Sequence, residues 1–384
     1  MQYHLDARRE DFSRAFEEVV NKAVELKPEF MIIAGDLFEE PRPSNQTLAT
    51  TIRDLKKLRD NGIKVLAVDG SHDSAPNIIT GTILTPLDKA GLLYYLPIHD
   101  GACWRDEDCY IYGIPNYRTR SKVVEKLPEF FTKHKPTPAK NLFNVFVFHG
   151  ALDDPKLKPY GVEAELNPDD LPDNFDYYAG GHIHRACKMN FKSGIIAYSG
   201  CLETTTYEET GGDKGFYYVK VDGHKGVDVE RVKLTSSRPF LVVTHDFSGK
   251  LPSKITEEAV GLIKASDTQD ALLVMILEGV LPSEARRADV NLAKIRNAAT
   301  KALYVHVVNK LEEVGISEEV RRTIFGTGKD IRVKAYEYFL KIFSERHSEK
   351  DAQHYAKTAI ELIDPLLQGR KDEVKKLLEG IPEK

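Results

Sequence analysis

Two histidines separated by one residue stand in a glycine-rich stretch, Gly180-Gly181-His182-Ile183-His184. Side chains of an extended segment alternate between its two faces, so His182 and His184 are expected on the same side. Two imidazoles on one side can bind a metal ion, but the same pattern also occurs in hydrogen-bonded turns. The pair therefore needs support from other segments of the chain.

Three other segments also end in side chains that can bind a metal ion. Each follows an apolar run typical of a buried strand: Asp36 follows 30–34, His72 follows 63–68 and His149 follows 142–148. In an α/β fold the chemistry gathers at the carboxyl ends of the strands. We therefore expect these residues and the histidine pair to converge on one face of a single sheet.

The expected ligand set combines one carboxylate with several neutral imidazoles. This combination suits Mn²⁺, Fe²⁺ or Zn²⁺, whereas a set made only of oxygen atoms would suit Mg²⁺ or Ca²⁺. One carboxylate can bridge two cations, and two ions about 3.5–4 Å apart can clamp the attacking and leaving oxygens of a phosphoryl group. The reaction that these residues predict is the hydrolysis of a phosphate ester.

The segments that must position these residues alternate between helix and strand. Helices are expected at 9–26, 44–58, 78–93 and 123–134, and further strands at 110–114 and 177–179. Short strands between 195 and 232, separated by glycine-rich turns, suggest a second sheet facing the first. The sequence thus predicts a layered α/β (α+β) fold, a two-sheet β-sandwich flanked by helices.

The predicted order of helices and strands changes near residue 237. Strands at 240–245, 271–277 and 303–308, with helices at 255–264 and 291–298, predict a small α+β module. Further helices are expected at 331–343 and 351–367, with a short one capped by Ser317. We expect three domains, at 1–236, 237–314 and 315–384. The apolar faces of the terminal helices either bind a partner or pack on the rest of the chain.

Composition narrows the classes of partner. The net charge of -5 means that a polyanion would have to bind local basic surface or bound cations. Arg118, Arg120 and Lys122 are candidates for phosphate contact, although a solvated surface is the favoured interpretation. The four cysteines form no C-x-x-C pair and are expected to be reduced thiols of a cytosolic protein. No apolar run approaches the roughly 20 residues of a membrane helix.

Four short motifs resemble those of the calcineurin-like metallophosphoesterases. They are G-D-L-F at 35–38, G-S-H-D at 70–73, H-G at 149–150 and G-H-I-H at 181–184. More narrowly, L-D-A-R-R-E-D-F at 5–12, L-F-E-E-P-R-P-S at 37–44 and Y-S-G at 198–200 resemble the archaeal Mre11/SbcD-type nucleases of DNA double-strand break repair. The resemblance covers 5–232 by motif and the remainder by architecture only.

The resemblance implies a role for each site residue. Asp36 would bridge two manganese ions, with Mg²⁺ as a possible substitute. His149 and His182 would bind one ion and His184 the other. His72 would contact the scissile phosphate and assist the leaving group, and Asp73 would steady its loop. From the residues alone, the less favoured alternatives are that His72 caps a loop and that His149 is a buried histidine at the end of a strand.

The resemblance also implies a function. It predicts a manganese-dependent nuclease, with 3'-5' exonuclease action on double-stranded DNA and endonuclease action on single-stranded DNA. The nuclease would form a homodimer through 44–58 and 78–93, and the 237–314 module would help to position DNA ends. The terminal helices would bind an SMC-like ATPase of the SbcC type, in the cytoplasm near the nucleoid. The alternatives are a non-catalytic DNA-end-binding scaffold and a small-molecule phosphodiesterase or phosphatase.

Two positions depart from the family pattern. Family members carry Asp-x-His on a first strand, whereas His4-Leu5-Asp6 has the reverse order, and we assign it no ligand role. We expect that the start of the sequence is misplaced and that the intact protein has this strand. Ser71 stands where the family has an asparagine ligand. Because a hydroxyl is a weaker donor to a cation, Ser71 would act through a water or not at all.

Overall fold

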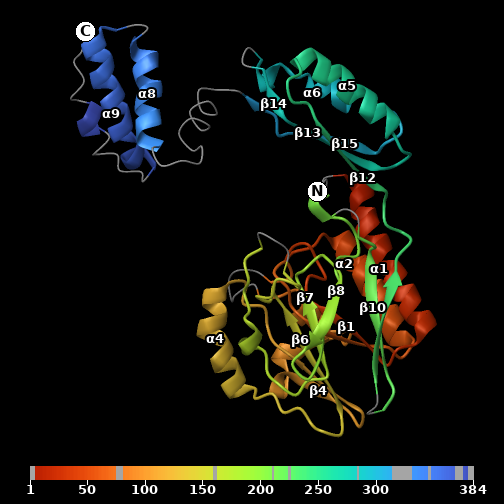
Figure 1. Ribbon diagram of the computed structural model, residues 1–384. Helices are drawn as coiled ribbons and strands as arrows, with labels where there is room; N and C mark the ends of the chain where they lie inside the picture. The colour runs from red at the N-terminus through yellow and green to blue at the C-terminus, as the bar shows by residue number, and fades with distance from the viewer. Residues whose placement is uncertain are drawn as a thin grey trace. The chain divides into compact units, whose positions relative to one another are not determined.

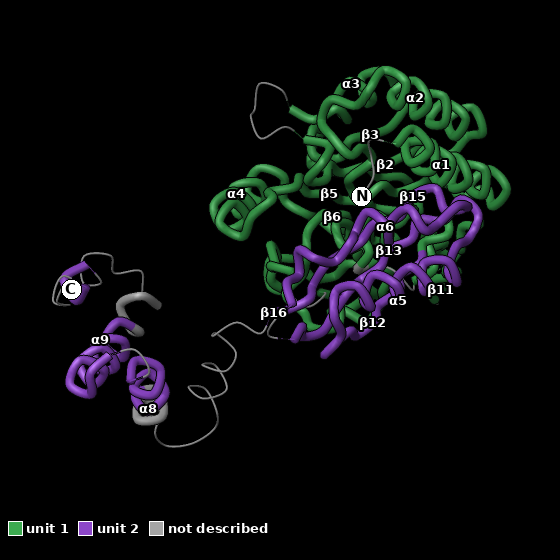
Figure 2. The backbone as a smooth tube through the Cα atoms, turned by 90° about the horizontal axis from the view of Figure 1, so that it is seen from above, with its two compact units in different colours: residues 1–240 green, residues 241–384 purple. Residues whose placement is uncertain are grey.

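The computed structural model describes residues 5–74, 81–158, 162–209, 212–223, 226–282, 285–313, 331–344, 347–367 and 375–378. The chain divides into two compact units, residues 1–240 and 241–384 (Figure 2). Unit 1 contains all the residues that the sequence predicts as metal ligands. Unit 2 contains both the predicted α+β module and the predicted terminal helices.

Two sheets form the centre of unit 1 (Figure 1). The first consists of three parallel strands, β1 (Phe30–Ala34), β2 (Lys64–Val68) and β3 (Tyr94–Tyr95). The second has the order β4-β5-β6-β7-β9-β8. Its strands are β4 (Cys103–Arg105), β5 (Cys109–Gly113), β6 (Phe143–His149), β7 (Tyr177–Gly181), β8 (Cys187–Phe191) and β9 (Gly194–Tyr198). The four central strands run parallel, and the two edge strands run antiparallel to their neighbours.

The alternation of side chains along β6 separates two cores. Val145 and Val147 pack against the first sheet, together with Leu66 of β2. Phe146 and Phe148 point to the opposite face, where they join the core beneath α4 (Arg120–Lys133). The outer face of the first sheet is covered by α1 (Asp6–Leu26), α2 (Asn45–Asp60) and α3 (Leu84–Lys89). The prediction of a two-sheet sandwich flanked by helices is therefore confirmed.

The assignment of the strands between 195 and 232 to a second sheet is wrong for β9. This strand pairs in parallel with β7 and so joins the sheet that carries β6. The ring of Tyr198 fills the space above Gly180, where a Cβ atom would lie only 2.7 Å from it. Only β10 (Gly215–Val221) and β11 (Val227–Lys233) form a separate antiparallel pair, which adds Val219 and Val229 to the core between the sheets.

The helix expected at 78–93 is much shorter in the structure. Helix α3 covers only Leu84–Lys89, and residues 75–80 lie outside the described part of the chain. The hydroxyl of Thr82 accepts a hydrogen bond from the backbone N–H of Leu84, which favours a helix start there. Gly91 has a φ of +65°, a left-handed conformation that follows many helix ends. The apolar pattern on both sides of α3 belongs to packed loops and to β3.

Unit 2 contains a three-stranded sheet in the order β12-β13-β15. Its strands are β12 (Phe240–Asp246), β13 (Leu272–Glu278) and β15 (Tyr304–Asn309), and α5 (Pro252–Ala265) and α6 (Leu292–Arg296) share their core. The short strands β14 (Val280–Leu281) and β16 (Glu312–Glu313) pair beside it. Helices α8 (Ile331–Ser344) and α9 (Glu349–Leu367) pack on each other, with Phe343 and Tyr355 ring centroids 5.7 Å apart. Ser317, the predicted cap, lies outside the described residues.

Short 3-10 helices complete the described elements: η1 (Leu96–Ile98), η2 (Asp100–Ala102), η3 (Pro168–Asp170), η4 (Tyr207–Glu209) and η5 (Arg287–Asp289). None of the helices within the described ranges has the length and apolar character needed to cross a bilayer.

A buried group of charges joins α1 to the loop after β9. The carboxylate of Asp11 accepts hydrogen bonds from Arg8 at 2.7 Å and from Arg238 at 2.6 Å. Arg8 also donates to the backbone carbonyl of Thr204 at 2.7 Å, and lies 3.4 Å from Glu203. Burial alone would raise the pKa of Asp11, but the guanidinium groups of Arg238 and Arg8 lower it. The ion cluster therefore fixes the loop at 199–209 to the first helix.

Replacing Asp11 by asparagine should destabilise the protein by about 3–5 kcal/mol at neutral pH, because the buried Arg8 and the largely buried Arg238 lose the carboxylate to which both donate. Since the folded pKa of Asp11 is lowered, its stabilisation is present above the ordinary value of about 4 and is lost as pH falls through the folded value. The difference between Asp11→Asn and the parent should therefore shrink below about pH 4. Urea unfolding at several pH values measures this. Glu230→Gln, in an exposed pair with Lys220, is the control and should cost under about 1 kcal/mol; equal effects would contradict the assignment.

Candidate metal centre

Asp36 lies in a tight turn directly after β1. Gly35 and Asp36 have φ values of +87° and +54°, and a left-handed non-glycine residue is a strained conformation that collects at functional sites. The Oδ1 atom of Asp36 accepts a hydrogen bond from the backbone N–H of His72 at 2.8 Å. Its Oδ2 atom lies 3.2 Å from Nε2 of His149. The turn thus directs the carboxylate toward a histidine on the other sheet.

His149, the last residue of β6, is buried and held in one orientation. Its Nδ1 atom lies 2.8 Å from the backbone oxygen of Ala34, to which it can only donate a hydrogen bond. Its Nε2 atom is therefore unprotonated in the neutral ring, and it has no hydrogen-bond partner within the described part of the chain. Buried polar atoms are nearly always paired, so an orphaned imidazole nitrogen beside a carboxylate fits a metal ligand.

His182 completes a group of three. Its φ of +87° is also left-handed, and its ring centroid lies 5.2 Å from that of His149. One donor atom from each of Asp36, His149 and His182 lies within 4.8 Å of the other two. The expectation that the residues converge on one sheet is wrong, because Asp36 follows a strand of the first sheet while the histidines end strands of the second. The site forms where two sheets approach each other.

Two glycines make this approach possible. A Cβ atom on Gly181 would lie 1.7 Å from the backbone oxygen of Ala34, so any side chain there would push the two sheets apart. A Cβ atom on Gly70 would lie 2.1 Å from Oδ1 of Asp36. These two glycines therefore allow the backbone of one segment to pack closely against Ala34 and Asp36.

The three groups are coupled electrostatically. Burial alone would raise the pKa of Asp36, but His149 and the backbone N–H of His72 lower it to about 2. Burial alone would lower the pKa of His149, and Asp36 raises it overall. Burial and the neighbouring His149 lower the pKa of His182. The low pKa keeps Asp36 as the ionised carboxylate, which is the form that binds a divalent cation.

The segment after β2 lies beside this group. His72 is half exposed, and its Nδ1 atom lies 2.9 Å from the backbone oxygen of Glu39. The hydroxyl of Ser71 lies 3.4 Å from Oδ2 of Asp36, so Ser71 contacts a ligand. Asp73 is fully buried and accepts hydrogen bonds from the backbone N–H groups of Gly70 and Phe38, each at 2.9 Å. Asp73 thus fixes the loop that carries His72.

His184 belongs to a second group. Its donor atoms lie within 4.8 Å of those of Cys201 and Glu209, and its Nδ1 atom lies 2.6 Å from Oε1 of Glu209. The sequence did not predict Cys201 or Glu209 as site residues, nor Glu165, whose Oε1 atom lies 3.5 Å from Nε2 of His182. No motif or spacing marks these residues, because they lie on loops that only the fold brings to the histidines.

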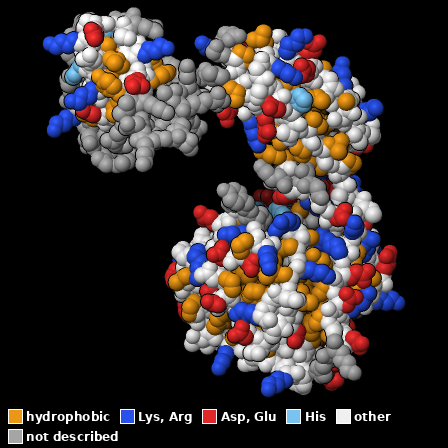
Figure 3. Space-filling view, viewed as in Figure 1, with side chains coloured by type: hydrophobic (Ala, Val, Ile, Leu, Met, Phe, Trp, Pro, Cys, Tyr) orange, Lys and Arg blue, Asp and Glu red, His pale blue; other side chains and the backbone are white. Residues whose placement is uncertain are grey.

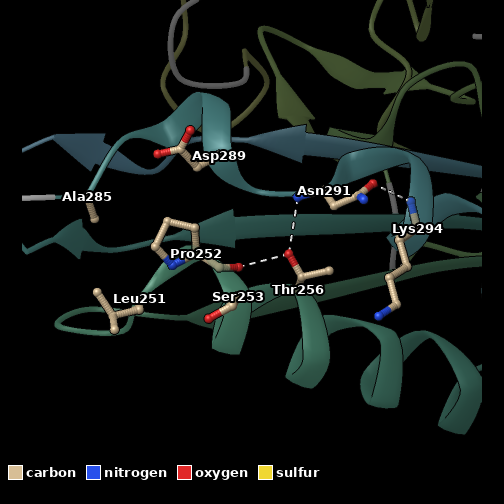
Figure 4. Close-up of a pocket in the computed structure, with 8 residues that line it drawn as sticks. All are labelled: Leu251, Pro252, Ser253, Thr256, Ala285, Asp289, Asn291 and Lys294. Carbon is tan, nitrogen blue, oxygen red and sulfur yellow. Dashed lines mark hydrogen bonds between the residues drawn. The ribbon is translucent and has the colours of Figure 1, made fainter.

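Unit 2 has a cavity of its own, of about 550 Å³ (Figure 4). It is lined by Leu251, Pro252, Ser253, Thr256, Ala285, Asp289, Asn291 and Lys294. The hydroxyl of Thr256 donates to the backbone oxygen of Pro252 and accepts from the backbone N–H of Asn291. The lining contains no histidine or cysteine. Among the described residues, the two groups that could hold a metal ion lie in unit 1.

Parts of the chain are similar to known proteins. Residues 4–186 match the Calcineurin-like phosphoesterase family. The chain is 32% identical over 235 residues to the DNA double-strand break repair protein Mre11 of Methanocaldococcus jannaschii, covering 58% of this chain and 60% of the relative. It is 28% identical over 345 residues to the Mre11 of Archaeoglobus fulgidus, covering 83% and 74%. For the Mre11 of Methanococcus maripaludis the values are 29% over 251 residues, covering 63% and 65%.

The match over residues 4–186, the two-sheet fold and the Asp36–His149–His182 group make the chain similar to the calcineurin-like phosphoesterases. The relatives described above are archaeal Mre11 proteins, and the chain is similar to them over more than half of its length. The alignment spans about three fifths of the length of the Methanocaldococcus jannaschii relative. The matched family implies divalent metal ions. The orphaned Nε2 atom of His149 and the adjacent carboxylate of Asp36 fit such an ion.

Gly181→Ala should destabilise the protein by about 1–3 kcal/mol or more, because the new methyl group would overlap the Ala34 carbonyl. It should also abolish the binding of a divalent metal ion, since the two sheets must separate. Chemical unfolding and calorimetric titration with Mn²⁺ measure the two effects. Gly261→Ala in α5 is the control, because a Cβ atom there meets no other atom within 4 Å. Normal Mn²⁺ binding by Gly181→Ala would show that the close approach is not needed.

Proposed function

We propose that this chain is the nuclease subunit of a DNA repair machine that hydrolyses phosphodiester bonds with Mn²⁺. The observation that carries the proposal is the convergence of Asp36, His149 and His182 in a chain similar to archaeal Mre11 proteins. The proposed activities are a 3'-5' exonuclease on double-stranded DNA and an endonuclease on single-stranded DNA, with Mg²⁺ as a substitute metal.

Each residue has a stated part in the proposed reaction. Asp36, His149 and His182 would hold one ion, while Asp36 and His184 would contribute to the second, with Ser71 acting at most through a water. When bound, divalent ions polarise phosphoryl oxygens and supply hydroxide at neutral pH. His72 is half exposed beside Asp36, and its Nδ1–H is taken by the carbonyl of Glu39. Its Nε2 atom is therefore the one that would contact the scissile phosphate or assist the leaving group.

The surface offers no single basic region for DNA on the face that Figure 3 shows, where Lys and Arg side chains are interspersed with Asp and Glu. Arg120 pairs with Asp170, Lys122 with Glu125, and Arg118 donates to the backbone oxygen of Ser74. These three side chains already bind other parts of the chain, which favours the interpretation that they form an ordinary solvated surface. We propose that DNA ends reach the site mainly through the bound ions, with unit 2 helping to position the duplex.

The proposed partners are a second copy of the chain and an SMC-like ATPase of the SbcC type. The homodimer would use α2, on which Ile52 is an exposed apolar residue, and the 78–93 segment, which is described from residue 81. The ATPase would bind the helices after Gly315. Action on chromosomal DNA would place the protein in the cytoplasm near the nucleoid.

Nuclease assays test the proposal directly. Purified protein with Mn²⁺ should degrade linear duplex DNA and nick single-stranded circles. Asp36→Asn should abolish both activities, and His72→Ala should lower the rate by about 10²–10⁴-fold with the metal still bound, because a proton-transfer residue is lost. His354→Ala, an exposed histidine on α9, should have no effect.

The other candidate functions predict different results in the same assays. A scaffold would bind DNA ends without cleaving them under any metal. A small-molecule phosphodiesterase would hydrolyse bis(p-nitrophenyl) phosphate but leave DNA intact. Either result would contradict the proposal.

Removing all residues after Phe325 should abolish binding of the SMC-like ATPase while leaving the Mn²⁺-dependent nuclease activity unchanged. The physical reason is that helices α8 and α9 pack on each other and lie far along the chain from the metal ligands. Co-purification of the tagged, truncated chain with the ATPase measures binding, and the full chain is the control. Retained co-purification would place the docking surface elsewhere.

A further inference from the structure

The backbone of His184 is hydrogen-bonded to the loop that follows β9. Its backbone oxygen accepts a hydrogen bond from the N–H of Cys201 at 3.1 Å. Gly200 makes this contact possible, because it has a φ of +76° and a Cβ atom there would lie 2.8 Å from the same oxygen. The main chain of His184 is therefore set by the loop, and the orientation of its ring depends on what the loop presents to it.

The loop presents the carboxylate of Glu209, from the short helix η4. Oε1 of Glu209 lies 2.6 Å from Nδ1 of His184. The backbone N–H of Thr205 donates to Oε2 at 2.9 Å, and the Thr205 hydroxyl donates to Oε1 at 2.5 Å. The Glu209 side chain is only 17% exposed. Two donors from Thr205 thus hold the carboxylate in one direction, toward the imidazole.

This contact decides which ring nitrogen carries the proton. An ionised carboxylate can only accept hydrogen bonds, so Nδ1 of His184 must be the donor. Nε2 of the neutral ring then keeps its lone pair. In a free histidine side chain the proton favours Nε2, so the loop imposes the less common tautomer. A metal-binding histidine commonly donates its other N–H to a carboxylate in this way, which fixes the ring and strengthens it as a ligand.

A separate ion held by His184, Cys201 and Glu209 is the competing interpretation, because their donor atoms lie within 4.8 Å of one another. Two observations favour the hydrogen-bonded arrangement. The ammonium group of Lys214 lies 3.1 Å from Sγ of Cys201, and Lys214 is buried, so a positive charge already lies beside the thiol. Both oxygens of Glu209 already accept hydrogen bonds from Thr205. A cation there would have to displace these contacts.

We propose that Glu209 is a positioning residue that holds His184 as the Nδ1–H tautomer and so leaves Nε2 free for the second metal ion. The proposal rests on the proposed function, in which His184 binds that ion. Thr205 supports Glu209 by fixing its carboxylate. His149 is prepared in the same way by a different acceptor, the carbonyl of Ala34.

The first test uses metal-free protein and does not depend on activity. Nitrogen-15 NMR of labelled histidines reports which ring nitrogen carries the proton at neutral pH. His184, assigned with His184→Gln, should show the Nδ1–H tautomer in the parent protein. Glu209→Ala should shift it toward Nε2–H, and Thr205→Val should do so in part. Glu230→Ala, an exposed glutamate on β11, is the matched control and should change nothing. An Nε2–H tautomer in the parent would overturn the proposal.

The second test measures metal binding in the same proteins. Titration with Mn²⁺, followed by electron paramagnetic resonance, should show that Glu209→Ala weakens the His184-dependent ion by about 10–100-fold while the His149-dependent ion is retained. Cys201→Ser should leave the number of bound Mn²⁺ and Zn²⁺ ions unchanged. Loss of an ion in Cys201→Ser would establish the competing site and overturn the proposal. Failure of the proposed function is distinguishable, because the parent would then lack Mn²⁺-dependent cleavage whatever the His184 tautomer.

Discussion

The backbone oxygen of Ala34 is the point on which the site depends. It lies against Gly181 with no room for a side chain, and it accepts the hydrogen bond of His149 Nδ1. One carbonyl at the end of β1 therefore sets the distance between the two sheets and the orientation of a ligand. The strained turn at Gly35 and Asp36 follows immediately, so the carboxylate reaches across the same gap. Strain in the backbone is stabilised here by packing on both sides.

Three imidazoles near the site, those of His149, His72 and His184, share one principle of orientation. Nδ1 of His149 meets the carbonyl of Ala34, Nδ1 of His72 meets the carbonyl of Glu39, and Nδ1 of His184 meets the carboxylate of Glu209. In each case an acceptor fixes the proton on Nδ1 and leaves Nε2 available for a metal ion or a phosphate. The protein thus orients these three rings through residues outside the candidate ligand set, which lie at the end of β1, in the segment between β1 and α2, and in η4.

The ion cluster formed by buried charges of α1 stabilises the same region. Arg8 binds the carbonyl of Thr204, and the next residue, Thr205, holds the carboxylate of Glu209. The loop after β9 is therefore bound to the ion cluster at Thr204, and at Glu209 it carries the carboxylate that orients His184. This continuity explains why a fully buried arginine is tolerated, since its counter-charges also anchor a loop of the site.

Local sequence patterns were enough to select Asp36, His149 and His182 as candidate metal ligands, because each lies at or just after the end of an apolar strand and beside a glycine. The sequence also predicted the layered α/β fold, because alternating helix and strand patterns are local properties. The folded structure was needed to show that the candidate ligands come from two sheets, that β9 joins the sheet of β7, and that His184 meets Glu209. The physical reason is that sheet partnership and side-chain contact depend on packing between distant segments. A residue such as Glu209, 25 positions from its histidine on a short turn, leaves no periodic pattern in the chain.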